Sequence, residues 1–370
     1  MLIAFLLNII AILLAFLSSV KTKKQRSYGL KLAFILLGAF MAFRYGYGND
    51  YFNYQMLYDQ YNGSGVELLD FSSYAKMNPK ELGWTFLCKL FKPLGYFGFL
   101  IFIAAIDNFI VYRFVKKYVN SSYYWLAVFV YTFNPYLYLI GCASMLRQWL
   151  AACIFLLAFQ FLYERKWIKY FAIVFIATLF HSSAIILYPV YLLVYFAKVK
   201  FNYSTISFVV ILLMAWYALA ASVLGFLSPL LLSMDEWNSY EGMFMDAKGT
   251  SFGLGVLMGI LLTVMCLTQI KNNEKANTLA TLDYSLNMLI TPIVMIVPIA
   301  ARFNSYFIIM SIIVFPLAFQ SFMKKNRFLG LCFLGFIMIY LLFMWFSIFT
   351  GVIWSWSFKE YHTIFEQNWQ

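Results

Sequence analysis

The sequence consists mainly of long apolar runs that are separated by short polar breaks. A membrane-spanning helix needs about 20 mostly apolar residues, whereas a strand of a membrane barrel needs about ten residues of alternating polarity. The runs therefore predict an all-α integral membrane protein, a polytopic helical bundle with about 12 transmembrane segments in a single domain over residues 1–370. The predicted spans are 2–20, 28–43, 94–112, 123–141, 143–163, 168–180, 182–197, 203–232, 251–270, 279–300, 303–323 and 328–350.

Composition supports this class and excludes others. Hydrophobic residues make up 64% of the chain and charged residues 11%, with a mean hydropathy of +0.78, whereas soluble domains carry about 25% charged residues. The net charge of +12 comes from short basic clusters between the runs, which is a topology signal of membrane proteins. We therefore expect no nucleic-acid partner. The five cysteines lie mostly in apolar runs without CxxC spacing, which favours small core residues over metal or disulfide roles.

The distribution of basic residues predicts the orientation. The first run has no basic residue before it and "KTKKQR" after it, whereas a cleavable signal peptide carries its charge in front. Alternate breaks hold 18 of the 27 Lys and Arg residues, which assigns those breaks to the inner side. Most acidic residues fall on the opposite side. We expect a retained first helix and both termini outside.

Two predicted outer segments, 44–93 and 233–250, are long enough to carry structure of their own. The stretch "ELGWTFLCKLFKPLG" is amphipathic but too short to cross, so it predicts an interfacial helix or a half-helix. The spans 168–180 and 182–197 are also short and meet at "LFHSSAIILYP". Broken helices are tolerated at membrane depth where they line a cavity. Tilted neighbours in a locally thin bilayer are the alternative.

Three arginines lie at helix ends on the predicted outer side: Arg44, Arg147 and Arg302. A charge near the membrane core costs about 3 kcal/mol on insertion scales, so it usually has a partner or a function. Each one alone could snorkel to a lipid phosphate. Three at one depth favour a site for a lipid-linked phosphate or pyrophosphate, because guanidinium binds phosphate oxygens through two parallel hydrogen bonds.

Candidate proton-transfer groups lie on the same side. Asp50 and Glu81 are carboxylates of the outer segment, and His181 lies between the two short spans. A histidine can exchange protons near neutral pH, although here it could equally cap a helix. Spacing does not choose among the three.

The stretch after Phe43, "RYGYGNDYFNYQMLYDQY", is crowded with tyrosines. Tyrosine packs against sugar faces, but it is also the ordinary residue of membrane interfaces. The chain has no Walker loop, no clustered DxD, no GxSxG and no HExxH. We therefore expect neither cofactor nor metal, and energy that comes from the substrate or from a gradient.

Taken in order, six motifs resemble the EpsG-like branch of the Wzy-type polysaccharide polymerases. They are "FRYGYGNDYFNY", "ELGWTFL", "LRQWLAA", "LFHSSAII", "ARFNSYF" and the tail "WSWSFKEYHTIF". The resemblance spans essentially the whole chain. It implies a bacterial inner-membrane enzyme with the architecture of GT-C-like membrane glycosyltransferases. Such an enzyme transfers a growing glycan from undecaprenyl pyrophosphate to the non-reducing end of a lipid-linked repeat unit on the outer, periplasmic face, without a metal.

The resemblance also implies roles for individual residues. Its motif positions include Arg44, Arg147 and Arg302 for the pyrophosphate, with Asp50, Glu81 and His181 as catalytic candidates. Glycan contacts are expected from Tyr47, Tyr51, Gln148 and Tyr306. "ELGW" has glycine where relatives often have proline, and "KEYHTIF" lacks a proline before tyrosine, so the local loop geometry departs from the pattern. The expected partners are the lipid-linked oligosaccharide, membrane lipids and, as a candidate, a chain-length regulator.

Other classes share part of this pattern. An O-antigen ligase or another lipid-linked sugar transferase uses the same donor and differs in its acceptor. A lipid-linked oligosaccharide flippase would also be a twelve-helix protein, but it would place ionisable groups along a central cavity, where the helix interiors offer chiefly Asp107 and Asp283. A membrane-bound acyltransferase would not need three outer arginines. The repeat unit, the linkage and the polymer class, whether O-antigen, capsule or exopolysaccharide, are not encoded in these motifs.

Overall fold

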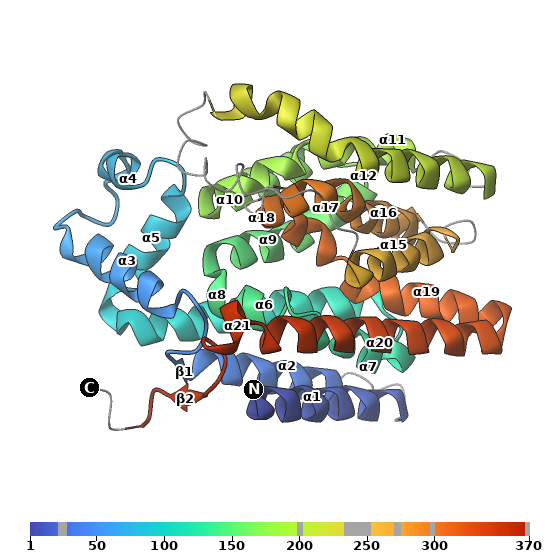
Figure 1. Cartoon of the computed structure of the whole chain (residues 1–370). Helices are drawn as coiled ribbons and strands as arrows, with labels where there is room; N and C mark the ends of the chain where they lie inside the picture. Colours follow the sequence, from blue (N-terminus) through green and yellow to red (C-terminus); the bar gives the residue numbers. More distant parts are fainter. Residues whose placement is uncertain (21–27, 198–202, 233–252, 270–274, 297–299, 367–370) are drawn as a thin grey trace.

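Helices that lie side by side form nearly all of the fold in this computed structural model (Figure 1). The structure describes residues 1–20, 28–197, 203–232, 253–269, 275–296 and 300–366. The predicted second outer segment, 233–250, lies outside the described residues. Across the described ranges, the two-residue strands β1 and β2 form the one sheet.

Each predicted span coincides with helical structure. The elements are α1 (Leu2–Val20), α2 (Tyr28–Ala42), α6 (Gly95–Tyr118), α7 (Tyr124–Phe133), α8 (Leu139–Ser144), α9 (Leu146–Tyr163), α10 (Trp167–Phe180), α12 (Tyr203–Leu232), α15 (Leu254–Leu267), α16 (Lys275–Ser285), α17 (Asn287–Ile296), α18 (Ala301–Ile308), α19 (Ser311–Lys325) and α20 (Arg327–Thr350). Within the described ranges, three helices are long and apolar enough to cross a membrane alone, or four if α18 and α19 form one bent span. The all-helical membrane class is therefore confirmed, and the count of 12 stays a prediction.

Several of the predicted spans are interrupted, among them 182–197 and 303–323. The segment after α10 contains the 3₁₀ helices η3 (Ser182–Leu187) and η4 (Pro189–Leu192) and the short α11 (Leu193–Phe196). The helices α18 and α19 meet at an angle of 44°. A 3₁₀ segment in place of an α-helix often marks a functional position, and non-helical backbone at membrane depth must be buried in protein. Both breaks lie near the polar pocket described below.

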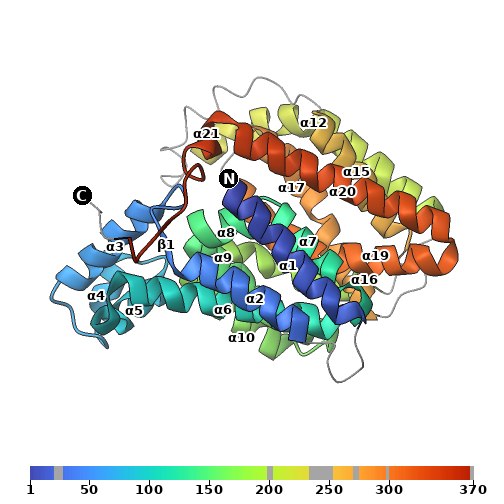
Figure 2. The same ribbon diagram turned by 90° about the horizontal axis from the view of Figure 1, so that it is seen from below.

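A cap of three short helices covers one end of the bundle (Figures 1 and 2). It contains α3 (Tyr51–Gly63), α4 (Phe71–Met77) and α5 (Leu82–Leu90), which continues through η1 (Lys92–Leu94) into α6. Tyr51, Tyr54, Tyr58 and Tyr61 recur at helical spacing and are all buried on one face of α3. The tyrosine row is thus largely the face by which α3 packs against α5 and α6.

The C-terminal segment holds the start of the cap in place. Strand β1 (Arg44–Tyr45) pairs antiparallel with β2 (His362–Thr363). The short helix α21 (Val352–Ser355) lies between α20 and β2, and the 3₁₀ helix η2 (Ser121–Tyr123) lies between α6 and α7. The ring of Tyr361 stacks on Phe40 at 4.0 Å between centroids. The amino group of Met1 donates to the carbonyl oxygen of Phe358 at 3.0 Å. The N-terminus and the C-terminal segment therefore lie together at the capped end.

The cysteines behave as the sequence predicts. All five are unpaired, and four are buried, whereas Cys332 is exposed. Their burial among apolar side chains is consistent with packing roles.

Gly48 gives a direct test of how tightly the cap entry is packed. Its φ of +112° and the position of its missing Cβ, 2.5 Å from the carbonyl oxygen of Ala143, leave no room for a side chain. We expect Gly48→Ala to cost about 1–3 kcal/mol of unfolding free energy. The readout is the thermal midpoint in detergent. Gly63→Ala is the matched control, since nothing lies within 4 Å of its Cβ position. Equal midpoints for both variants would contradict the tight packing.

Candidate functional site

A polar pocket of about 320 Å³ opens where the cap meets the bundle. It brings together Asp50 and Glu81 from the cap, Arg147 and Gln148 from α9, and His181 and Arg302 from the broken segments. Six of the ten site residues expected from the sequence therefore share one cavity, although they are up to 252 positions apart. The other lining residues are Asn53, Tyr54, Leu57, Ser144, Met145 and Ser182.

Four helices begin at this pocket. Asp50 and Glu81 precede α3 and α5, Arg147 lies in the first turn of α9, and Arg302 lies in the first turn of α18. A helix N-terminus carries about half a positive charge and unsatisfied N–H groups, so it favours an anion. Neither Asp50 nor Glu81 caps its own helix through a side-chain hydrogen bond. The helix N-termini and the two arginines thus contribute positive charge to the pocket, opposite the carboxylates of Asp50 and Glu81.

The buried carboxylate of Glu81 fixes the position of Arg147. A guanidinium nitrogen of Arg147 donates to Oε2 of Glu81, and the Glu81 side chain is only 8% exposed. The guanidinium also lies over the ring of Tyr54, 5.6 Å from its centroid, a favourable cation–π geometry. Because Arg147 remains 27% exposed, it can still meet a ligand in the pocket.

His181 is held as a neutral imidazole in the turn between α10 and η3. The backbone N–H of Ser183 donates to Nδ1 at 3.2 Å, and the Ser183 hydroxyl lies 2.6 Å from the same nitrogen. An N–H can only donate, so Nδ1 is unprotonated and the proton is on Nε2, 3.8 Å from Oε1 of Glu81. Burial, with the charges of Arg147 and Arg302, lowers the pKa of His181 to about 3.

Gln148 connects the two arginine-bearing helices. Its side-chain amide donates to the backbone carbonyl of Arg302 and to the hydroxyl of Ser305, both at 2.7 Å. Gln148 is buried, whereas Arg302 is exposed and its guanidinium makes no hydrogen bond or ion pair to any described residue. The helix ends are therefore fixed while the charge of Arg302 remains free for a ligand.

Asp50 is the least engaged carboxylate of the pocket. It is half-buried, and its side chain accepts one hydrogen bond, from the amide of Asn53 at 3.2 Å. Glu81, in contrast, is buried and holds Arg147. Of the two, Asp50 can therefore accept a proton from a bound molecule without breaking an ion pair.

Four expected site residues do not line the pocket. Arg44 is 1% exposed and donates to the carbonyl oxygen of Met41. The rings of Tyr47 and Tyr51 are buried, and Tyr47 packs edge-on against Phe358 at 4.9 Å. Tyr306 is also buried, but its hydroxyl lies 3.1 Å from that of Ser183, one contact behind His181. Arg44, Tyr47 and Tyr51 thus support the cap entry from within, which local sequence did not indicate.

Sequence reasoning missed several residues of the site. Tyr54 had a usable signal, because a helix starting at residue 51 places it one turn after Asp50. Asn53, Ser144 and Ser183 carried no signal, because polar residues of these types are common in turns. Among the described residues, no group of three His, Cys, Asp or Glu side chains lies close enough to hold a metal ion.

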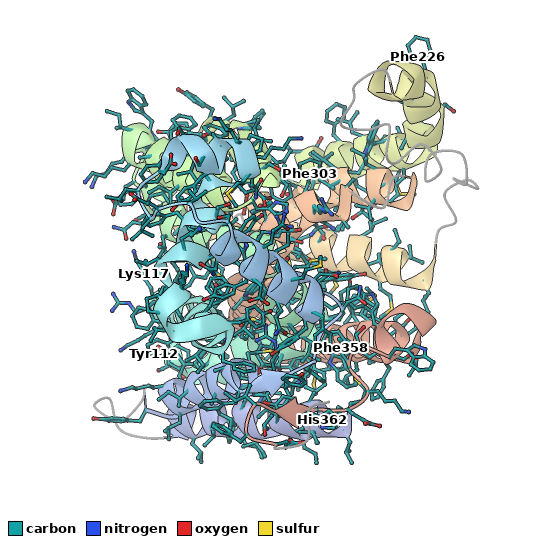
Figure 3. All side chains as sticks on the ribbon, turned by 90° about the vertical axis from the view of Figure 1, so that its left-hand side faces the viewer. Tyr112, Lys117, Phe226, Phe303, Phe358 and His362 are labelled. Carbon is teal, nitrogen blue, oxygen red and sulfur yellow. The ribbon has the colours of Figure 1, made fainter. Side chains whose placement is uncertain are left out.

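The fold and the pocket define a helical membrane protein with a polar pocket, lined by two arginines, at one end. Figure 3 looks onto that end and shows Phe303, next to Arg302, inside the outline of the bundle, whereas Phe226 of α12 lies at its edge. The chain belongs to the EpsG family, whose sequence pattern it matches over residues 28–363. Membership confirms the resemblance and indicates a role of the polysaccharide-polymerase type in polysaccharide biosynthesis. No curated protein and no solved structure matches the chain.

The Glu81–Arg147 pair gives a prediction for stability. In a double-mutant cycle of Glu81→Gln and Arg147→Gln, we expect a coupling free energy of about 1–3 kcal/mol, because removing one partner leaves the other charge buried and unpaired. The measurement is unfolding in detergent. The Glu164–Lys166 pair, in which the lysine is 53% exposed and neither partner is buried, is the control and should show coupling close to zero. Equal coupling in the two pairs would contradict a structural role for the buried one.

Proposed function

We propose that this protein is a bacterial polysaccharide polymerase of the inner membrane. It transfers a growing glycan from undecaprenyl pyrophosphate to the non-reducing end of a second lipid-linked repeat unit on the outer face, and it has a GT-C-like architecture. The observation that carries the proposal is the pocket in which Arg147, Arg302 and four helix N-termini surround the uncommitted carboxylate of Asp50. This arrangement suits a reaction that releases pyrophosphate and removes a proton.

The proposed step is a substitution at the anomeric carbon of the donor sugar. A hydroxyl oxygen of the acceptor sugar forms the new bond to that carbon, while the bond from the carbon to the pyrophosphate oxygen breaks. The bonding electrons leave with the lipid pyrophosphate, and Asp50 takes the hydroxyl proton. Negative charge therefore develops on the leaving group, where Arg147 and Arg302 already provide donors before the reaction begins. The bond that breaks is the energy source, so the step requires neither ATP nor a metal.

Glu81, His181 and Gln148 serve this step as positioning residues. Glu81 holds Arg147, and the Nε2–H of His181 faces the same carboxylate. His181 cannot easily act as the base, since its free lone pair at Nδ1 already accepts from Ser183. Gln148 ties α9 to α18 through the carbonyl of Arg302. Together these contacts fix the guanidinium of Arg147 and the backbone from which the Arg302 side chain extends.

The same pocket would serve a ligase that uses another acceptor, so the acceptor must be tested directly. A flippase is less well supported, because Asp107 and Asp283 are fully buried and neither lines the pocket. The test is incubation of the purified protein in nanodiscs with undecaprenyl-pyrophosphate repeat units of its host alone, with a chelator and without ATP or sugar nucleotide. A glycan ladder supports the polymerase. Repeat units that cross liposomes without forming a ladder would favour the flippase.

Arg302 allows the pyrophosphate contact to be tested without disturbing an internal ion pair. In the ladder assay we expect Arg302→Ala to lower the turnover rate by about 10²–10³-fold, as the loss of one transition-state donor usually does. Arg302→Lys should restore only part of the rate, because an ammonium cannot form the bidentate contact. Arg327→Ala, an exposed cation at the opposite end, is the control. Full rescue by lysine would reduce the role to simple charge.

Asp50 is tested by an isosteric change. We expect Asp50→Asn to lower the turnover rate by about 10²–10⁴-fold, the usual contribution of a general base. Retention of lipid-linked donor and the thermal midpoint should stay at the wild-type level, because the amide keeps the shape and the contact to Asn53. Asp59→Asn, another carboxylate of α3, is the control. Wild-type turnover of Asp50→Asn would assign the proton to another group.

A further inference from the structure

A second cavity, of about 390 Å³, lies between α6 and α9 at the end of the bundle opposite the polar pocket. Its lining residues are Ile110, Arg113, Phe114, Lys116, Lys117, Tyr118, Leu156, Leu157 and Gln160. The volume falls within the range of about 300–1,000 Å³ that ligand pockets have. From Arg147 to Gln160 the helix α9 rises by about 20 Å, so the two cavities are separate.

Three cations line one side of this cavity. Lys116 and Lys117 follow Arg113 on α6 by three and four residues, so both lie beside it on the helix surface, and all three are exposed. Like charges at this spacing repel each other by about 0.2–0.5 kcal/mol per pair in an isolated helix. Among the described residues, no carboxylate forms an ion pair with any of them. No carboxylate of the described residues therefore neutralises these three charges.

The acidic side chain of Glu164, which Gln160 contacts, does not neutralise them either. Lys117 donates to the Oε1 of Gln160 at 2.5 Å, and Gln160 in turn donates to Glu164 at 2.8 Å. The other oxygen of Glu164 pairs with Lys166 at 2.7 Å. Gln160 thus orients the Lys117 ammonium at the cavity. Lys116 lies 3.3 Å from the hydroxyl of Tyr112, which is a neutral partner.

The other side of the cavity is apolar. Ile110 and Phe114 of α6 and Leu156 of α9 are buried, whereas Leu157 is 46% exposed. Ile110 lies about one turn before Arg113 on α6, and Leu156 and Leu157 lie about one turn before Gln160 on α9. Figure 3 shows Lys117 and Tyr112 at the margin of the bundle, away from its centre. A ligand for this cavity must therefore combine an anionic group at the helix end with a hydrocarbon part that lies along the helices.

We propose that this cavity binds an anionic glycerophospholipid of the bilayer, with its phosphate on Arg113, Lys116 and Lys117 and its acyl chains along Ile110, Phe114 and Leu157. Guanidinium binds phosphate through two parallel hydrogen bonds, and basic pockets between membrane helices are suited to acidic headgroups. The proposal does not depend on the polymerase function. The bound lipid would hold α9, the helix that carries Arg147 and Gln148, against α6.

The preference for basic residues at inner helix ends explains why cations lie at this end, but it does not by itself produce a cavity between two helices. The chain offers an internal comparison. Lys324, Lys325 and Arg327, at the turn between α19 and α20, are exposed at the same end of the bundle and do not line the cavity. A general charge effect would act on both clusters alike, whereas a lipid site acts on only one.

The experiment measures lipid binding to the full chain in detergent by native mass spectrometry and by thermal shift. The probes are phosphatidylglycerol and, as the zwitterionic comparison, phosphatidylcholine with the same acyl chains. The test variant is Arg113→Gln/Lys116→Gln/Lys117→Gln, and its matched control is Lys324→Gln/Lys325→Gln/Arg327→Gln. The single change Arg113→Gln provides a milder variant if the triple one is poorly folded. Glycerol 3-phosphate tests the headgroup without acyl chains.

For the wild-type chain and the control, we expect phosphatidylglycerol to bind about tenfold more tightly than phosphatidylcholine, with the larger thermal shift. The test variant should lose this preference, and Arg113→Gln should lose part of it. Glycerol 3-phosphate at the same concentration should not displace the lipid. An unchanged preference in the test variant, an equal loss in the control, or displacement by glycerol 3-phosphate would each overturn the proposal.

Discussion

The buried ion pair between Glu81 and Arg147 is the contact on which the arrangement of the pocket depends. Glu81 belongs to the cap and Arg147 to the bundle, so the pair adds a charged contact to the hydrophobic cluster in which the cap packs against the starts of α6 and α9. A charge in a medium of low dielectric constant is costly alone, and each of these residues makes the other tolerable. His181 faces the same carboxylate through its Nε2–H. Moving the cap would leave Glu81 and Arg147 buried without compensation, which gives the site a single preferred geometry.

Around this pair, the pocket assembles positive charge from backbone as well as side chains. The helices α3, α5, α9 and α18 all begin there, two of them in the cap and two in the bundle. The breaks before η3 and before α18 bring His181 and Arg302 into the same pocket.

The opposite end of the bundle uses positive charge differently. At the pocket, Arg147 is neutralised in part by Glu81, whereas Arg113, Lys116 and Lys117 have no acidic partner among the described residues. The first arrangement matches the transient pyrophosphate that we propose for the pocket, and the second matches the resident lipid that we propose for the other cavity. Residues of α9 line both cavities, so this helix connects the two ends.

The sequence by itself determined the helical membrane class, the position of each apolar segment, the broken character of 182–197 and the family. These features follow from local hydrophobicity and from motif order, which need no knowledge of packing. It also selected six residues that share the pocket. Only the tertiary structure separated Arg44 from Arg147 and Arg302. All three look alike as arginines at helix ends, but the pairing of β1 with β2 buries Arg44. Likewise, the tyrosine row became a packing face because α5 and α6 lie against it, and contacts between distant segments cannot be read from local pattern.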